Sequence, residues 1–119
     1  MEYAWKSLAP DPTAFRPFVE RMIALEHEPM AWEEDVKALK APVLIIAGDS
    51  DMMTLEHVVS MYRLLGGGYP GDMGKPLGAS RLAILPATSH TAVIDQTELL
   101  MGFIAPFLAG ETPKGMFDQ

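Results

Sequence analysis

Residues 42–51 read PVLIIAGDSD, an apolar and partly β-branched run that ends at a glycine and two acidic residues. A run this apolar is typical of a strand buried on both faces, as in a parallel sheet. We therefore expect a strand over residues 43–47, with Asp49 and Asp51 just past its carboxyl end. Ligands of open α/β sheets bind at that end. The stretch thus predicts both the fold class and the place where chemistry would occur.

A second apolar run, RLAILP at residues 81–86, predicts a second buried strand. Between the two runs, Thr54 is positioned to cap an amphipathic helix whose apolar residues are Leu55, Val58, Val59, Tyr62 and Leu65. Strand–helix–strand order predicts a parallel pair with a right-handed crossover. Residues 66–79 are expected to be an irregular excursion, because they are rich in glycine and proline. They lack the spacing of a phosphate-binding loop.

The amino-terminal third of the chain predicts two helices. Residues 1–12 hold two prolines and are expected to be an extended lead-in. A proline costs about 3 kcal/mol inside a helix and little at its first position, so the first helix is expected to begin near Pro17. It is expected to end near Glu28, and a second short helix is expected over residues 33–39.

The carboxyl-terminal part predicts one more helix, capped by Thr97 and weakened by Gly102 and Pro106, with a kink or early stop near the proline. Residues 110–119 are expected to be a tail. The resulting division of the chain is a helical lead-in at residues 1–39, an α/β segment at residues 40–109, and this tail.

The composition excludes several classes of protein. The chain has 119 residues, a net charge of −7, no cysteine and no cluster of lysine or arginine. We expect one domain at most, no disulfide, no zinc site, and no nucleic-acid or membrane partner. Without a signal-peptide pattern or a long apolar run, the expectation is a soluble, cytoplasmic chain.

Two parallel strands do not make a stable sheet by themselves. Both runs are apolar enough to need cover on two faces and further neighbouring strands. We therefore expect a partial three-layer α/β fold, completed by another segment or by another chain, and we expect the isolated chain to form an oligomer.

Asp51 and His90 are the residues that we expect to carry chemistry. They follow the two strands, about 4.8 Å apart in a sheet, and can meet at hydrogen-bond distance. A carboxylate that accepts from one ring nitrogen leaves the other as a base. Three alternatives stay open: an ordinary loop histidine, a GDSD sequence that only makes a turn, and Asp49 as the acid.

Other residues have simpler interpretations. His27 and His57 are interpreted as structural or solvated residues. Met52 and Met53 would line an apolar substrate pocket or, as the simpler interpretation, fill gaps in the core. No set of residues has the spacing of metal ligands, so we expect neither a metal nor a cofactor. Aromatic residues that would anchor a lid or an interface are Tyr3, Trp5 and Trp32.

The sequences PVLIIAGDSD and SRLAILPATSHT, with the helices after them, resemble the carboxyl-terminal part of the α/β-hydrolase family. The resemblance covers residues 40–109 and depends on Gly48-x-x-Asp51 and on Ser89-His90. It implies a hydrolase sheet and a catalytic triad in which Asp51 is the acid and His90 is the base. Residues 1–39 would correspond to the end of the lid.

The nucleophile motif of the family pattern is missing from this sequence. The nucleophile of that family lies in a G-x-S-x-G turn, and no such motif is present. Gly48-Asp49-Ser50 and Gly78-Ala79-Ser80 contain Gly-x-Ser without the final glycine. The resemblance therefore implies an esterase-like hydrolase that acts on a small ester-type substrate, with its nucleophile supplied by an amino-terminal half or another chain. The alternative is an inactive, truncated hydrolase-fold oligomer or interaction protein.

Overall fold

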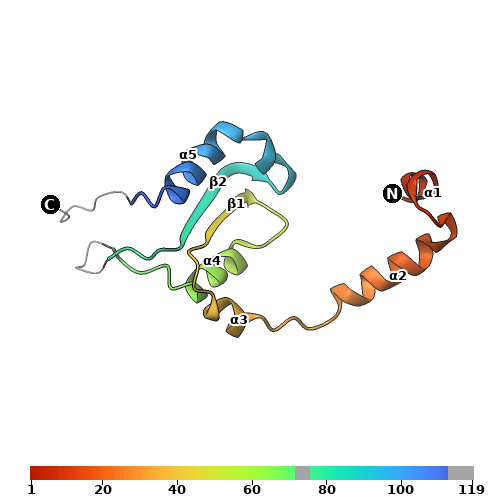
Figure 1. Cartoon of the computed structure of the whole chain (residues 1–119), viewed down its shortest axis with the longest axis horizontal. Coiled ribbons are helices and arrows are strands. Elements are labelled where there is room, and N and C mark those ends of the chain that lie inside the picture. The colour runs from red at the N-terminus through yellow and green to blue at the C-terminus, as the bar shows by residue number, and fades with distance from the viewer. Residues whose placement is uncertain (72–75, 113–119) are drawn as a thin grey trace. The chain divides into compact units, whose positions relative to one another are not determined.

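The structure is a computed structural model that describes residues 1–71 and 76–112 (Figure 1). The chain divides into two units, Met1–Ala31 and Trp32–Gln119, and each is described by itself. The first unit is helical, and the second contains the sheet. Most of the expected tail, and the middle of the glycine-rich excursion, lie outside the described residues.

The two apolar runs form a parallel pair of strands, as predicted. β1 spans Leu44–Ser50 and β2 spans Arg81–Ser89. Residues 44–48 of β1 lie opposite residues 81–85 of β2. Each strand runs three residues farther than its apolar run, because backbone pairing continues into the polar residues. The chain is therefore α/β, with a two-stranded parallel sheet.

The register of the two strands changes near their carboxyl ends. Gly48 lies opposite Leu85, and Ser50 lies opposite Ser89, so Asp49 alone faces the three residues from Pro86 to Thr88. An insertion of this kind is a β-bulge, which bends a strand and redirects the residues that follow it. Proline in a strand is a recognised marker of an edge or a bulge.

The crossover helix α4 spans Leu55–Leu64 and begins where the sequence predicts. The Thr54 hydroxyl accepts a hydrogen bond from the His57 amide at 3.3 Å, which completes the amino-terminal cap. Gly66, with φ of 84°, follows the end of the helix in a conformation that glycine adopts without strain. α4 contacts β1 and lies on the β1 side of the sheet (Figure 1).

The expectation of an extended lead-in is wrong for Glu2–Leu8, which form helix α1. Trp5 stacks on Phe18 with ring centroids 4.7 Å apart, and its indole nitrogen donates to the Asp11 carbonyl at 3.1 Å. These contacts come from residues distant in sequence, so local patterns did not reveal the helix. Tyr3 is exposed, and only Trp5 of the expected aromatic anchors packs within this unit.

The second helix of this unit, α2, spans Phe15–Glu26 after a short 3-10 turn, η1, at Pro12–Ala14. It begins earlier than predicted, since Pro17 occupies the third helical position rather than the first. The first amides of a helix have no partner within it, so a proline there removes no hydrogen bond. The Asp11 carboxylate caps η1 by accepting from the Thr13 amide at 2.9 Å.

The short helix α3 spans Glu33–Ala38, which confirms the helix predicted over residues 33–39. It belongs to the second unit and contacts α4. The division based on the sequence had grouped these residues with the lead-in. Trp32, at the start of α3, is largely exposed.

The last helix, α5, spans Thr97–Leu108 and follows a 3-10 turn, η2, at Thr91–Asp95 (Figure 1). The predicted cap residue and the predicted early stop near Pro106 are wrong. Gln96, not Thr97, occupies the cap position, and it makes no side-chain cap hydrogen bond. The helix also continues through Pro106, because a proline in the last turn removes one hydrogen bond and leaves the others in place, including Ala109 N–H to the Ala105 carbonyl at 3.0 Å.

Few large side chains are buried in the described residues. The buried apolar residues are Ala47, Val58 and Leu85. Large apolar side chains remain exposed on α4, on β2 and on α5, among them Leu55, Val59, Ile84, Met101, Phe103 and Leu108. In residues 1–71 and 76–112, no helix is long and apolar enough to cross a membrane.

Candidate active site

Asp51 and His90 lie at the carboxyl edge of the sheet, each directly after its strand. The strands predicted from the apolar runs end at residues 47 and 86, whereas the strands of the structure continue to Ser50 and Ser89. His90 Nδ1 lies 2.9 Å from Asp51 Oδ1. The expected meeting of the acid and the histidine is therefore present in the structure.

The two side chains differ in their exposure to solvent. The Asp51 side chain is 4% exposed, whereas the His90 side chain is 57% exposed. The Asp51 carboxylate also accepts from the Met53 amide at 3.3 Å and from the Gly48 amide at 3.4 Å. A buried, multiply hydrogen-bonded acid thus holds an imidazole whose other side is open.

These hydrogen bonds set the charge of Asp51. Burial by itself raises the pKa of this carboxyl, but hydrogen bonds from Met53, His90 and Gly48 outweigh it and leave the pKa below the ordinary value. An ionised carboxylate only accepts hydrogen bonds, so Nδ1 of His90 must carry a proton. In the neutral ring, Nε2 then has the free lone pair of a base.

Asp49, the alternative acid, lies elsewhere. Its Oδ2 accepts from the Ala87 amide at 2.8 Å, and its Oδ1 accepts from the Thr88 amide at 3.1 Å. These hydrogen bonds hold the pKa of Asp49 below its ordinary value. The Asp49 carboxylate therefore binds the bulge of β2, and Asp51 is the acid that contacts His90.

Neither Ser50 nor Ser80 is placed to act as the nucleophile. The Ser50 hydroxyl donates to Asp49 Oδ1 at 3.1 Å. Ser80 is buried at the amino end of β2, where its hydroxyl accepts from the Val43 amide at 3.2 Å. Within residues 1–71 and 76–112, no side chain forms a hydrogen bond with His90 Nε2.

The methionines after the acid do not fill the core. Met52 is 84% exposed and Met53 is 45% exposed, so the core-filling interpretation is wrong. His27 follows the end of α2 and is exposed, and His57 is exposed on α4. In the part of the chain that the structure describes, no three or more acidic or histidine side chains gather in a way that could hold a metal ion.

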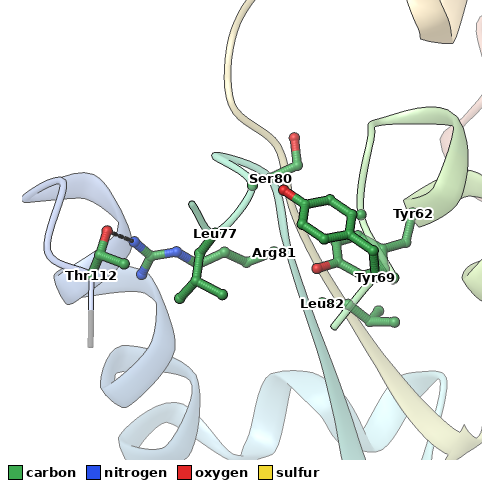
Figure 2. Close-up of a pocket in the computed structure, with 10 residues that line it drawn as sticks. Tyr62, Tyr69, Leu77, Ser80, Arg81, Leu82 and Thr112 are labelled. Atoms are coloured by element: carbon green, nitrogen blue, oxygen red, sulfur yellow. Dashed lines mark hydrogen bonds between the residues drawn. The ribbon is translucent and has the colours of Figure 1, made fainter. Parts of the chain in front are cut away.

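A cavity of about 260 Å³ lies at the opposite, amino end of β2 (Figure 2). Several of its polar side chains are paired within the chain. The Arg81 guanidinium donates to the Glu111 carbonyl and to the Thr112 hydroxyl, and it lies over the Phe107 ring. Tyr69 donates to the Pro76 carbonyl at 2.9 Å. The polar groups of Arg81 and Tyr69 are therefore paired without a ligand.

Sequence reasoning missed the residues that shape the bulge. A Cβ at Gly48 would lie 1.9 Å from the Thr88 carbonyl oxygen, so only glycine fits there. The fully buried Thr88 hydroxyl donates to the Pro86 carbonyl at 2.9 Å and accepts from the Gln96 amide. The proline inside an otherwise strand-like run was the available signal.

The two depressed carboxyl pKa values predict an acid-labile site. A carboxyl whose folded pKa is lowered adds stability above its unfolded pKa of about 3.9, and this stability is lost as the pH falls through the folded value. We expect the free energy of unfolding to be lower in Asp49→Asn than in wild type at neutral pH, with a difference that shrinks as the solution is acidified. Urea denaturation over a series of pH values measures this.

Thr54→Ala is the matched control, because it weakens a helix cap without removing a titratable group. Its stability curve should run parallel to that of wild type. A constant difference between Asp49→Asn and wild type at every pH would contradict the prediction.

Comparison of the chain with protein-family models, with curated proteins and with solved structures finds no match.

Proposed function

We propose that this chain contributes the acid and the histidine of an α/β-hydrolase that cleaves a small ester-type substrate, in the cytoplasm. The observation that carries the proposal is the 2.9 Å contact between the buried Asp51 carboxylate and the exposed ring of His90. It lies at the carboxyl edge of a parallel sheet, where open α/β folds place their chemistry. The hydrolase resemblance of residues 40–109 adds the same two residues in the same order.

The proposed chemistry follows the protonation states of this pair. A serine hydroxyl from a partner segment attacks the ester carbonyl, and Nε2 of His90 takes its proton. The imidazolium, stabilised by the Asp51 carboxylate, returns that proton to the departing alkoxide. Water then attacks the acyl-enzyme with His90 again as base, the bond between the acyl carbon and the serine oxygen breaks, His90 returns the proton to that oxygen, and the free acid leaves.

The outer edge of β1 is available to pair with a strand from a partner segment. The Arg81 amide donates to the Val43 carbonyl at 2.8 Å, so alternate residues of β1 face β2. Leu44 and Ile46 then direct their amides and carbonyls away from β2. On β2 the outward positions include Pro86, which has no amide proton and is followed by the bulge. Such features protect an edge strand, and β1 has none of them.

We infer that the nucleophile follows a strand that runs parallel to β1 in the completed sheet. Only a parallel strand would bring its carboxyl end to the edge that holds Asp51 and His90. A second copy related by a two-fold axis would pair antiparallel and would leave the two acid–histidine pairs at opposite ends. The second copy would therefore complete the sheet without completing the site.

The test is purification of the full chain with its partner, followed by assay with p-nitrophenyl esters. Support requires a co-purifying chain or an adjacent encoded segment with G-x-S-x-G after a predicted strand, together with esterase activity of the complex. A partner that lacks the motif, or a complex that is inactive on the ester panel, would count against the proposal.

The alternative function is an inactive hydrolase-fold oligomer. It is favoured by the absence of a nucleophile beside His90 in the described residues and by the small buried core. Stable self-association without any activity in the presence of the G-x-S-x-G segment would favour this alternative.

The isolated chain is expected to self-associate through the open edge of β1. Ile46→Pro removes an outward amide of β1 without touching the β1–β2 hydrogen bonds, so it should shift the chain toward monomer. Ile84→Pro is the matched control, because it removes an outward amide of β2. Light scattering coupled to gel filtration measures both. A wild-type monomer with a cooperative melt would contradict the prediction.

A further inference from the structure

The contact between Asp51 and His90 depends on the bulge in β2. Across Gly48–Ser50, β1 advances by two residues while β2 advances by four. If the earlier register continued, Thr88 rather than His90 would lie opposite Asp51. The two extra residues of β2 therefore bring the histidine to the acid.

The bulge contains an unfavourable backbone conformation, which other interactions must stabilise. Ala87 has φ of 51°, in the left-handed region that residues with a side chain rarely adopt. The amides of Ala87 and Thr88 both point at the Asp49 carboxylate, at 2.8 Å and 3.1 Å. One side chain of β1 thus binds two successive amides of the bulge.

The other hydrogen bonds of the bulge lie on a different part of it. The Thr88 hydroxyl donates to the Pro86 carbonyl and accepts from the Gln96 side chain. These bonds fix the Thr88 side chain, whereas the Ala87 amide is bound by Asp49. Among the described residues, Asp49 is therefore the β1 side chain that ties the two strands together at the bulge.

We propose that Asp49 is a positioning residue for His90, acting through the β2 bulge rather than by contact with the imidazole. Its carboxylate holds Ala87 and Thr88 so that the chain reaches His90 in register with Asp51. The importance of Asp49 for catalysis rests on the proposed function, whereas its effect on the position of the His90 ring does not depend on that function. Asp49 thus has a role distinct from that of Asp51, although the two carboxylates lie two residues apart.

The test reads the protonated ring nitrogen of His90 by NMR in the full 119-residue chain, without a substrate or a partner. Long-range ¹H–¹⁵N spectra in alkaline buffer, where imidazoles are neutral, distinguish the Nδ1–H tautomer from the Nε2–H tautomer. Wild type is expected to show Nδ1–H at His90. Asp49→Asn is expected to lose most of this signal, with the proton moving to Nε2.

Two controls bracket the result. Asp51→Asn removes the acceptor itself and should abolish the Nδ1–H preference. Glu56→Gln removes one exposed negative charge from the first turn of α4 and should leave the tautomer as in wild type. His27 and His57, both exposed, serve as internal references whose signals should not change.

Retention of the wild-type tautomer in Asp49→Asn and in Asp49→Ala would overturn the proposal. Unfolding of Asp49→Asn, seen by circular dichroism, would also overturn it, because Asp49 would then hold the fold rather than the histidine. Inactivity of the assembled hydrolase would leave the tautomer result standing, so failure of the proposed function is distinguishable from failure of this role.

Discussion

His90→Ala is expected to lower kcat/KM for p-nitrophenyl ester hydrolysis by about 10⁴-fold or more in the complex with the nucleophile segment. The imidazole is the group that would take the serine proton and return it to the leaving alkoxide, and alanine has no replacement for it. The 2.9 Å contact with Asp51 and the open Nε2 side support this assignment. Steady-state kinetics of the purified complex measure the loss.

Asp51→Asn should reduce kcat by a similar factor, about 10⁴-fold. An asparagine preserves the shape of the side chain but presents an uncharged amide to Nδ1, which no longer selects the Nδ1–H tautomer or stabilises the imidazolium. His57→Ala is the matched control for His90→Ala, since His57 is exposed on α4. Full activity of His90→Ala in the complex would show that the role given to His90 is wrong.

Gly48→Ala is expected to destabilise the sheet domain by about 2–3 kcal/mol. The added methyl group would lie 1.9 Å from the Thr88 carbonyl oxygen and 2.6 Å from its carbonyl carbon. Both atoms belong to the backbone, so the strands must move apart at the bulge to make room. Thermal unfolding should show a midpoint lower by roughly 10 °C or more.

Gly102→Ala provides the matched control for this substitution. A Cβ at Gly102 meets nothing within 4 Å, and the residue lies inside α5. Alanine there should raise stability by about 0.5–1 kcal/mol, because glycine is a poor helix former. Equal melting temperatures for Gly48→Ala and wild type would contradict the prediction. They would show that the strands can move apart at the bulge without a loss of stability.

Local patterns predicted those elements whose stability comes from neighbouring residues in the sequence. The apolar run at residues 43–47 required a buried strand, and Thr54 with the apolar stripe after it required a capped helix. The placement of Asp51 and His90 on one sheet edge followed from the parallel order of two strands. These parts of the fold and of the candidate site could be predicted without coordinates.

The elements that were missed depend on residues distant in sequence. α1 is stabilised by Trp5 against Phe18, and no local periodicity reports that contact. Gln96 precedes the threonine that was predicted to cap the last helix, and it directs its side chain to Thr88. In each case the partner lies in another element, so the pattern within one element carried no trace of it.

The sequence by itself determined that this chain has two parallel strands, with an acid and a histidine at their carboxyl ends. The apolar runs require buried strands, and the strand–helix–strand order places the carboxyl ends of both strands at one edge. Both features are properties of the linear chain. Only the tertiary structure decided which acid meets the histidine. Asp49 and Asp51 have the same side chain and lie only two residues apart in the sequence. In the structure the bulge directs the Ala87 and Thr88 amides to Asp49, whereas Asp51 contacts His90.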